Sequence, residues 1–166
     1  MPISERFFAG GSTTLRGFDF EEAGPRAVIV PQGTFLNSSG QQVTLDPFTL
    51  PFGGNALAIV NLEARLPISR SLRAVPFYDG GNVFRRAGDI FNPPNANTSF
   101  EKNLRALWSH TVGLGFRLRT PVGGELGVDI GYLINPPRFL IPQINNPDAI
   151  YKLRQTQIHF RFSQAF

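Results

Sequence analysis

The chain has 166 residues, which is the size of one domain and leaves no room for an independent second one. Its 16 Phe and 17 Gly, against one Met and one Trp, favour β-structure with many turns, and the absence of Cys excludes disulfides and thiolate metal sites. The formal net charge is +4, but the 16 Lys and Arg residues are scattered rather than clustered, which argues against a nucleic-acid partner.

The chain offers no helical route across a membrane. No apolar run comes near the roughly 20 residues that a transmembrane helix needs, and residues 1–5 carry no cleavable signal pattern. A membrane role would therefore require a β-barrel. Because neither a signal nor a partner strand precedes Glu5, we expect the chain to start within a longer protein.

The first notable stretch, residues 5–18, is a loop rich in Gly, Ser and Thr with Arg16 near its end (ERFFAGGSTTLRGF). A lone Arg among polar residues is usually a solvated loop charge. Here, however, Gly17 lets the backbone fold tightly beside the guanidinium, and Glu63 and Asp79 fall on inward positions of the strands predicted below. A guanidinium can pair bidentately with such carboxylates in a partly dry interior, so Arg16 is a candidate for a buried ion pair.

A long loop and then a strand follow. Residues 19–54 contain four prolines, Asn-Ser-Ser-Gly and a final Gly-Gly, which predict a loop, with a short strand extension over the apolar run 26–31. Residues 55–66 alternate with a period of two, which predicts a strand. One face of that strand carries Ala58, Val60, Leu62, Ala64 and Leu66, and the other carries Asn61, Glu63 and Arg65.

The second predicted strand covers residues 72–84 and should return as a hairpin partner, because residues 67–71 form a short turn. Its inward side would carry Arg73, Phe77 and Asp79, and its outward side Leu72, Ala74 and Tyr78. Pro76 would lie mid-strand, where proline requires a bulge or an unpaired N–H position. Residues 85–105 are a second long polar loop.

Three further strands are predicted at residues 108–120, 125–133 and 155–166. The first two are joined by a tight turn, and residues 135–152, with four prolines, predict a third long loop before the last strand. The outward faces carry Val112, Leu114, Phe116 and Leu118, then Leu126, Val128, Ile130 and Tyr132, then Ile158, Phe160, Phe162 and Phe166. The inward faces carry Thr111, Gly113, Gly115, Arg117 and Arg119, then Gly127, Asp129 and Gly131, then Gln157, His159, Arg161 and Ser163.

The lengths of the connections favour a membrane barrel over a soluble sandwich. They alternate long, short, long, short, long. Transmembrane barrels have short turns on one side, longer loops on the other, and strands of about 9 to 11 residues with apolar and polar faces. A soluble sandwich would place the charged faces in solvent, but the regular alternation of loop lengths would then be a coincidence.

The segments ERFFAGG, LRGF, GGNALAIVNLEARLP, VPFYDGGNVF, GLGFRLRTPVG, GVDIGYLINP and a terminal Phe occur in this order. This ordered set resembles the C-terminal part of the bacterial outer-membrane barrel-assembly factors, the surface-antigen superfamily that includes BamA-like and TamA-like proteins. The resemblance implies that residues 1–54 are a long extracellular loop that folds back into the barrel lumen. It implies that residues 55–166 are the last five strands of a sixteen-stranded antiparallel barrel in the bacterial outer membrane.

The resemblance also implies roles for individual residues. Arg16, Gly17 and Phe18 match the family's Arg-Gly-Phe motif, which anchors the tip of the loop to the inner barrel wall. Glu63 and Asp79 match the wall acids that receive the arginine.

The last strand is similar to the C-terminal recognition signal of outer-membrane barrels, carried here by Ile158, Phe160, Phe162 and Phe166. It departs from that signal at Gln164, where an apolar or aromatic residue is common. The family inserts other β-barrels into the outer membrane, so the implied partners are the lipid bilayer, client β-barrels, and accessory lipoproteins or upstream periplasmic domains. The last strand would template a client strand at the lateral seam of the barrel.

Enzymatic readings find no support in the residues, and no cofactor is expected. Neither His110 nor His159 has an acid pair at metal-binding spacing. No Ser lies in a nucleophile elbow, and the Asp79-Gly-Gly-Asn82 segment lacks the acidic ladder of a calcium loop. Two non-enzymatic alternatives stay open. The same superfamily contains pores that export a partner protein through the lumen, and five strands alone would form an inactive piece with two open edges that aggregates.

Overall fold

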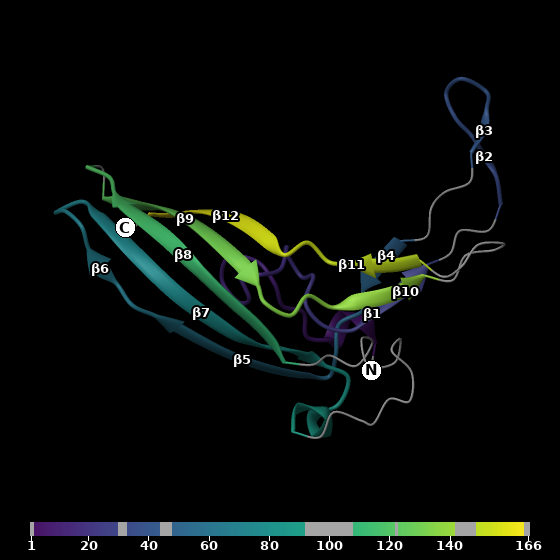
Figure 1. The fold of residues 1–166 in the computed structure, drawn as a ribbon, viewed down its shortest axis with the longest axis horizontal. Helices are drawn as coiled ribbons and strands as arrows, with labels where there is room; N and C mark the ends of the chain where they lie inside the picture. Colours follow the sequence, from purple (N-terminus) through teal and green to yellow (C-terminus); the bar gives the residue numbers. More distant parts are fainter. Residues whose placement is uncertain are drawn as a thin grey trace.

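The computed structural model is all-β and describes residues 2–29, 33–43, 48–91, 108–121, 123–141 and 149–164 (Figure 1). The strands are β1 (Arg26–Ile29), β2 (Phe35–Leu36), β3 (Gln42–Val43), β4 (Phe48–Pro51), β5 (Ala56–Glu63), β6 (Leu66–Pro67), β7 (Leu72–Phe84), β8 (Ser109–Arg119), β9 (Gly124–Leu133), β10 (Arg138–Ile141), β11 (Ala149–Lys152) and β12 (Thr156–Gln164). The described residues also form two 3-10 turns, η1 (Ile3–Glu5) and η2 (Ala87–Ile90). Within the described ranges, no helix is both long and apolar enough to cross a membrane.

One antiparallel sheet dominates the molecule, in the order β12-β9-β8-β7-β5, with β6 pairing with β7 beyond the end of β5. The predicted antiparallel all-β fold is therefore confirmed, and the predicted strand bounds agree with β7, β8 and β9 to within one residue. The short turns between β6 and β7 and between β8 and β9 lie at one end of the sheet, on the left in Figure 1. The described parts of the longer connections, η2 and the β10–β11 pair, lie at the other end.

The predicted strand over residues 55–66 is divided in two by a proline on its neighbour. β5 pairs with β7 as far as Glu63, and β6 resumes the same register at Leu66. Between them the Ala64 N–H donates to the Pro76 carbonyl at 3.0 Å. Pro76 has no N–H with which to return the bond, so the ladder is interrupted at this point.

Two predicted loops carry more regular structure than expected. The loop at residues 135–152 contains an antiparallel hairpin of β10 and β11, which corrects the expectation of an irregular connection. In the first loop, the expected strand extension is present as β1, which pairs with β4, and β2 pairs with β3 in a small hairpin. Residues 30–31 of that extension and residues 92–105 of the second long loop lie outside the described residues.

The two faces of the main sheet differ as the alternation predicts. One face exposes a row of large apolar side chains from β5, β8, β9 and β12, including Val60, Leu62, Val112, Leu114, Phe116, Leu118, Leu126, Ile130, Tyr132, Ile158, Phe160 and Phe162. The opposite face buries the polar residues Asp79, Thr111, Arg117 and Asp129. A continuous apolar face with charged residues behind it is the pattern of a membrane barrel wall.

The apolar core lies on the polar, concave side of the sheet, where the N-terminal loop packs against the wall. It comprises Ala9, Leu15, Phe18, Ala23, Val83, Leu133 and Leu153, with Ile59 packed at its edge. Isolated bridges from Phe7 to Gly54 and from Ala9 to Ala23 close this loop upon itself. The N-terminal loop is therefore folded and is held against the sheet by apolar contacts.

Candidate functional site

Arg16 is presented by a tight turn of the N-terminal loop. The Phe18 N–H donates to the Leu15 carbonyl at 3.1 Å, and the Gly11 N–H donates to the Phe18 carbonyl at 3.1 Å. Leu15 and Phe18 are both fully buried. Because these apolar residues flank the tip of the turn, their packing pushes Arg16 and Gly17 against the sheet.

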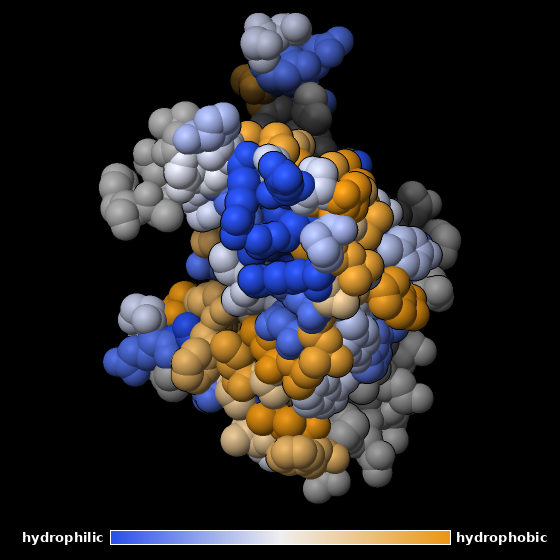
Figure 2. Space-filling model, turned by 90° about the vertical axis from the view of Figure 1, so that its left-hand side faces the viewer, coloured by the Kyte–Doolittle hydropathy of each residue, from blue (hydrophilic) through white to orange (hydrophobic). Residues whose placement is uncertain are grey.

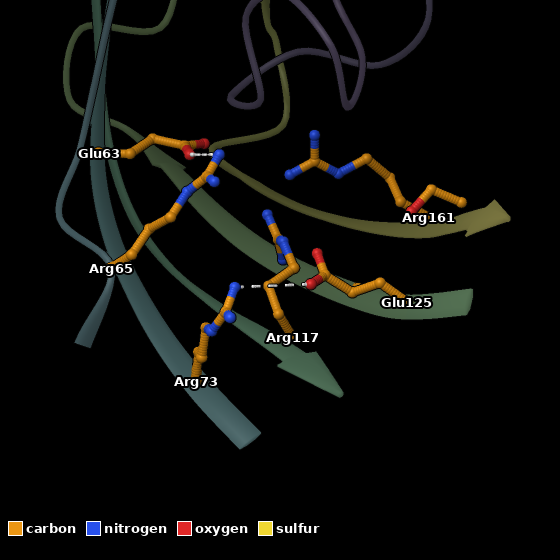
Figure 3. Close-up of a pocket in the computed structure, with 8 residues that line it drawn as sticks. Glu63, Arg65, Arg73, Arg117, Glu125 and Arg161 are labelled. Carbon is orange, nitrogen blue, oxygen red and sulfur yellow. Dashed lines mark ion pairs between the residues drawn. The ribbon is translucent and has the colours of Figure 1, made fainter. Parts of the chain in front are cut away.

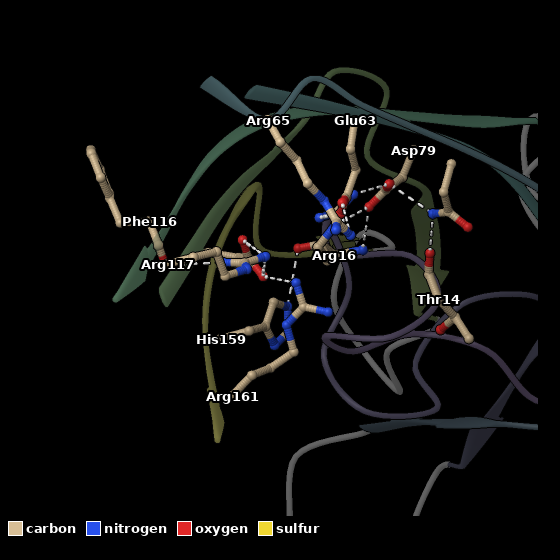
Figure 4. Close-up of polar contacts among 11 residues, drawn as sticks. Thr14, Arg16, Glu63, Arg65, Asp79, Phe116, Arg117, His159 and Arg161 are labelled. Carbon is tan, nitrogen blue, oxygen red and sulfur yellow. Dashed lines mark hydrogen bonds and ion pairs between the residues drawn. The ribbon is translucent and has the colours of Figure 1, made fainter. Parts of the chain in front are cut away.

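The Arg16 guanidinium binds Asp79 of β7 in a bidentate fashion (Figure 4). Nε donates to Oδ2 at 2.7 Å and Nη2 to Oδ1 at 2.6 Å, while the Arg16 backbone N–H also donates to Oδ2 at 3.0 Å. Asp79 is completely buried and Arg16 nearly so. Charge-assisted pairs of this geometry are the strongest side-chain hydrogen bonds, and they fix direction as well as distance.

A second acid and an aromatic ring complete the surroundings of the guanidinium. Arg16 Nη1 lies 2.6 Å from Glu63 Oε1 on β5, and the guanidinium carbon lies 3.5 Å from the centre of the Phe77 ring. Burial by itself lowers the pKa of Arg16, but hydrogen bonds and charge from Asp79 and Glu63 outweigh burial and raise that pKa above its ordinary value. Arg16 is therefore a permanent cation held between two carboxylates and an aromatic face.

Two further side chains bind the loop, and the sequence reasoning did not assign them. Asn61 Nδ2 donates to the Thr14 carbonyl and to Asp79 Oδ1, both at 2.7 Å. His159 Nε2 on β12 donates to the Arg16 carbonyl at 3.1 Å. The alternation along each strand predicted that both side chains face inward. It could not identify their backbone partners, because those depend on the folded position of the loop.

Glycines allow the loop and the wall to approach at backbone distance. A Cβ at Gly17 would overlap the side chain of Thr111 on β8, and a Cβ at Gly131 on β9 would overlap the Arg16 carbonyl. The Thr111 hydroxyl is buried and makes no hydrogen bond among the described residues. The contact therefore depends on the absence of side chains at positions 17 and 131.

A second buried carboxylate, Asp129 of β9, lies on the same face. Arg117 of β8 donates to both of its oxygens, at 2.7 and 2.9 Å, and Arg161 of β12 approaches within 2.8 Å. Gly115 makes room for this carboxylate, because a Cβ there would overlap Asp129 Oδ1. This network ties three neighbouring strands together and was also missed, although all three charges were predicted to face inward.

The whole chain, residues 1–166, matches the family model described as the Omp85 superfamily domain. The chain belongs to the Omp85 superfamily. Proteins of this superfamily are bacterial outer-membrane proteins that act in the insertion of outer-membrane proteins and in secretion. Its members are transport and assembly proteins rather than enzymes.

In this Omp85 chain, the sequence-predicted residues fall into two separate groups. Arg16, Glu63 and Asp79 meet at the contact between the loop and the wall, with Gly17 and Phe18 beside them. Ile158, Phe160 and Phe162 lie on the outward face of β12, away from that contact, and all three side chains are exposed. Phe166 lies outside the described residues.

The remaining polar groups offer no metal site in the described part of the chain. No group of three or more His, Asp or Glu residues there could hold a metal ion. The acids of the Omp85 wall are paired with arginines instead: Glu63 and Asp79 pair with Arg16 of the loop, and Asp129 pairs with arginines of the two neighbouring strands.

Proposed function

We propose that this chain belongs to an assembly factor that inserts client β-barrels into the outer membrane, with β12 as the edge that templates a client strand. The observation that carries the proposal is the position of β12. It lies at the end of the sheet order and pairs with β9 along its whole length, from Thr156 opposite Tyr132 to Gln164 opposite Gly124. Its other edge has no partner strand within the described residues.

The physical reason for strand capture is the cost of an open edge in lipid. Each unpaired backbone N–H or C=O group in the hydrocarbon costs several kcal/mol. Phe160 and Phe162 of β12 are 78% and 64% exposed on the lipid-facing side, so this edge belongs at membrane depth. A client strand that pairs with the edge satisfies those groups, which is β-augmentation in a membrane.

The loop supports this function by holding the wall in one shape. On this proposal residues 1–54 form an extracellular loop that reaches into the lumen, and residues 55–166 form the wall. Arg16, Gly17 and Phe18 anchor the loop, Glu63 and Asp79 receive it, and His159 extends the contact to β12. No step involves covalent chemistry, so the proposed protein is not an enzyme.

The partners proposed for this function are the lipid bilayer, client β-barrels, and accessory lipoproteins or upstream periplasmic domains. The bilayer would contact the apolar face of the sheet, and client strands would contact β12. No nucleic acid is involved in this proposal.

Disulfide trapping in cells tests the proposal, because the chain has no Cys of its own. Gln157→Cys and Ser163→Cys place single thiols along β12, and Leu114→Cys on the central strand β8 is the control. A templated client carrying single cysteines in its terminal strand should cross-link to each β12 position in a fixed register, and not to position 114.

Two outcomes would contradict templating. Cross-links from β12 without any preferred client position would show proximity without strand pairing. Cross-links of an exported protein to lumen positions such as Arg65→Cys, with none to β12, would favour the secretion pore instead.

A further inference from the structure

A second charged feature adjoins the loop contact at Glu63 and extends toward the short-turn end of the polar face. It is a cavity of about 140 Å³ that opens between the ends of β5, β7, β8, β9 and β12. Its lining consists of Glu63, Arg65, Arg73, Arg117, Glu125, Gly127, Arg161 and Ser163. Figure 2 looks onto this end and shows hydrophilic residues gathered between hydrophobic flanks.

Four arginines from four different parts of the wall converge on this cavity (Figure 3). Arg117 and Arg161 are the inner pair, and both bind the buried carboxylate of Asp129 at 2.7 to 2.8 Å. The inner pair is therefore held in place by the Asp129 carboxylate behind it, and its guanidiniums form the positively charged base of the cavity.

The outer pair is held much less tightly. Arg65 approaches Glu63 at 3.5 Å, while the other oxygen of Glu63 is taken by Arg16 at 2.6 Å. Arg73 lies 4.0 Å from Glu125, which is beyond hydrogen-bonding distance. The Arg65 side chain is 70% exposed, so its guanidinium has donors that face the water of the cavity.

The lining has an excess of cations. Four guanidiniums face two carboxylates in the lining. When the buried partners Arg16, Asp79 and Asp129 are included, five guanidiniums stand against four carboxylates, so an excess of one positive charge remains. Guanidiniums present paired N–H donors in a planar fork that matches a carboxylate. A cavity of this volume has room for a carboxylate group of a side chain.

The location selects the class of ligand. The cavity opens on the face opposite the apolar row, so lipid head groups on the outside of the wall do not reach it. It lies at the end with the short turns, which in outer-membrane barrels is the periplasmic end. Proteins of this superfamily act in outer-membrane protein insertion and in secretion, so the molecules on which they act are polypeptides.

We propose that the Arg65, Arg73, Arg117 and Arg161 cavity binds acidic side chains of a polypeptide that enters the lumen from the periplasmic mouth. An Asp or Glu carboxylate of that segment would accept hydrogen bonds from the guanidinium of Arg73 or Arg65. The positive charge of the inner pair would lie below it. The inference rests on the superfamily's action on polypeptides and not on templating by β12, and it is tested by direct binding, separately from barrel insertion.

The test uses the intact protein in detergent and a short fluorescent peptide of alternating Asp and Ser, read out by fluorescence anisotropy. A peptide of alternating Asn and Ser is the uncharged probe. We expect the acidic peptide to bind and the uncharged one not to bind. Arg65→Gln with Arg73→Gln should weaken binding about tenfold, because two charge-assisted contacts are lost. Arg70→Gln removes the same charge from the exposed turn outside the cavity and should change affinity less than about twofold.

A variant that should bind the acidic peptide more tightly provides an independent test, because a gain of affinity cannot come from misfolding. Glu125→Gln removes the carboxylate that competes for Arg73, so it should tighten binding of the acidic peptide. Equal weakening by Arg70→Gln and by the double variant, or unchanged affinity in Glu125→Gln, would overturn the proposal. Displacement of the peptide by inorganic phosphate, beyond that by chloride at equal ionic strength, would also overturn it in favour of a free-anion site.

Discussion

The guanidinium of Arg16 meets the carboxylate of Asp79 through two parallel hydrogen bonds of 2.7 and 2.6 Å, across 63 residues of sequence. The same carboxylate also accepts the Arg16 backbone N–H and the amide of Asn61. One buried anion therefore binds the side chain and the backbone of the loop tip, and a neighbouring wall residue. Its removal disturbs the loop and the wall together.

Reversal of the Arg16 charge should abolish the contact. Arg16→Glu places a third carboxylate beside Glu63 and Asp79, and breaking a buried pair in this way costs about 3–5 kcal/mol. We expect little folded barrel in outer membranes and loss of client-barrel assembly. Adding Asp79→Arg restores opposite charges and should recover part of both. Folded and unfolded forms are separated by heat-modified gel mobility.

The charge reversal has a matched control and a clear contrary result. Arg70→Glu makes the same change at an exposed turn and should leave assembly intact. Normal assembly in Arg16→Glu would show that Arg16 acts as an ordinary loop charge. Export of a partner protein that stops while barrel assembly continues would assign the loop contact to secretion.

The close approach of Gly17 to Thr111 can be tested by enlarging the side chain at position 17 and shortening the one at position 111. Gly17→Ala adds a Cβ that overlaps the Thr111 side chain and should destabilise the fold by about 1–3 kcal/mol. Thr111→Ala alone should lower the stability only slightly, because the hydroxyl that it removes makes no hydrogen bond among the described residues. The combination should recover much of the loss, as measured by urea unfolding. Gly88→Ala, which has open space around it, is the control. Additive losses in the double variant would refute the steric account.

The Asp129 network should respond unequally to loss of its members. Asp129→Asn leaves two guanidiniums without their carboxylate, one of them buried, and should cost about 3–5 kcal/mol in urea unfolding. Arg161→Gln should cost much less, because Arg161 is partly exposed and the Arg117 Nη2 keeps its hydrogen bonds to both Asp129 oxygens. Equal losses of stability in the two variants would mean that Asp129 stabilises the protein no more than a single exposed ion pair does.

The hydrogen bond from His159 to the Arg16 carbonyl should control opening of the loop more than global stability. His159→Ala removes one bond and should cost about 1 kcal/mol. We expect faster protease cleavage within residues 5–18 with only a small change in the unfolding midpoint. His159→Phe keeps the ring and loses the donor, so it should behave like the alanine variant. Unchanged cleavage in both would show that the bond does not hold the loop.

The strand positions and the two faces of the sheet followed from the order of residues alone. Side chains in a strand alternate with a period of two, so Val112 and Leu114 had to face one way once Thr111 and Arg117 faced the other. The agreement of β7, β8 and β9 with the predicted ranges reflects this local rule. The Omp85 membership was also readable from the ordered segments.

Other features depended on contacts between residues far apart in the sequence. The division of β5 from β6 arises because Pro76 of the neighbouring strand lies opposite Ala64, and that pairing is a matter of register. The pairing of β10 with β11 lies inside a proline-rich segment whose composition indicates a loop.

The same holds for the polar networks. Periodicity placed Asn61, Asp129 and His159 on the inner face but could not assign their partners, because a partner is set by strand register and by the folded position of the loop. The convergence of Arg65 and Arg73 with Arg117 and Arg161 has the same origin. A linear pattern determines the direction in which each charge points, whereas the curvature and pairing of the sheet determine which charges meet.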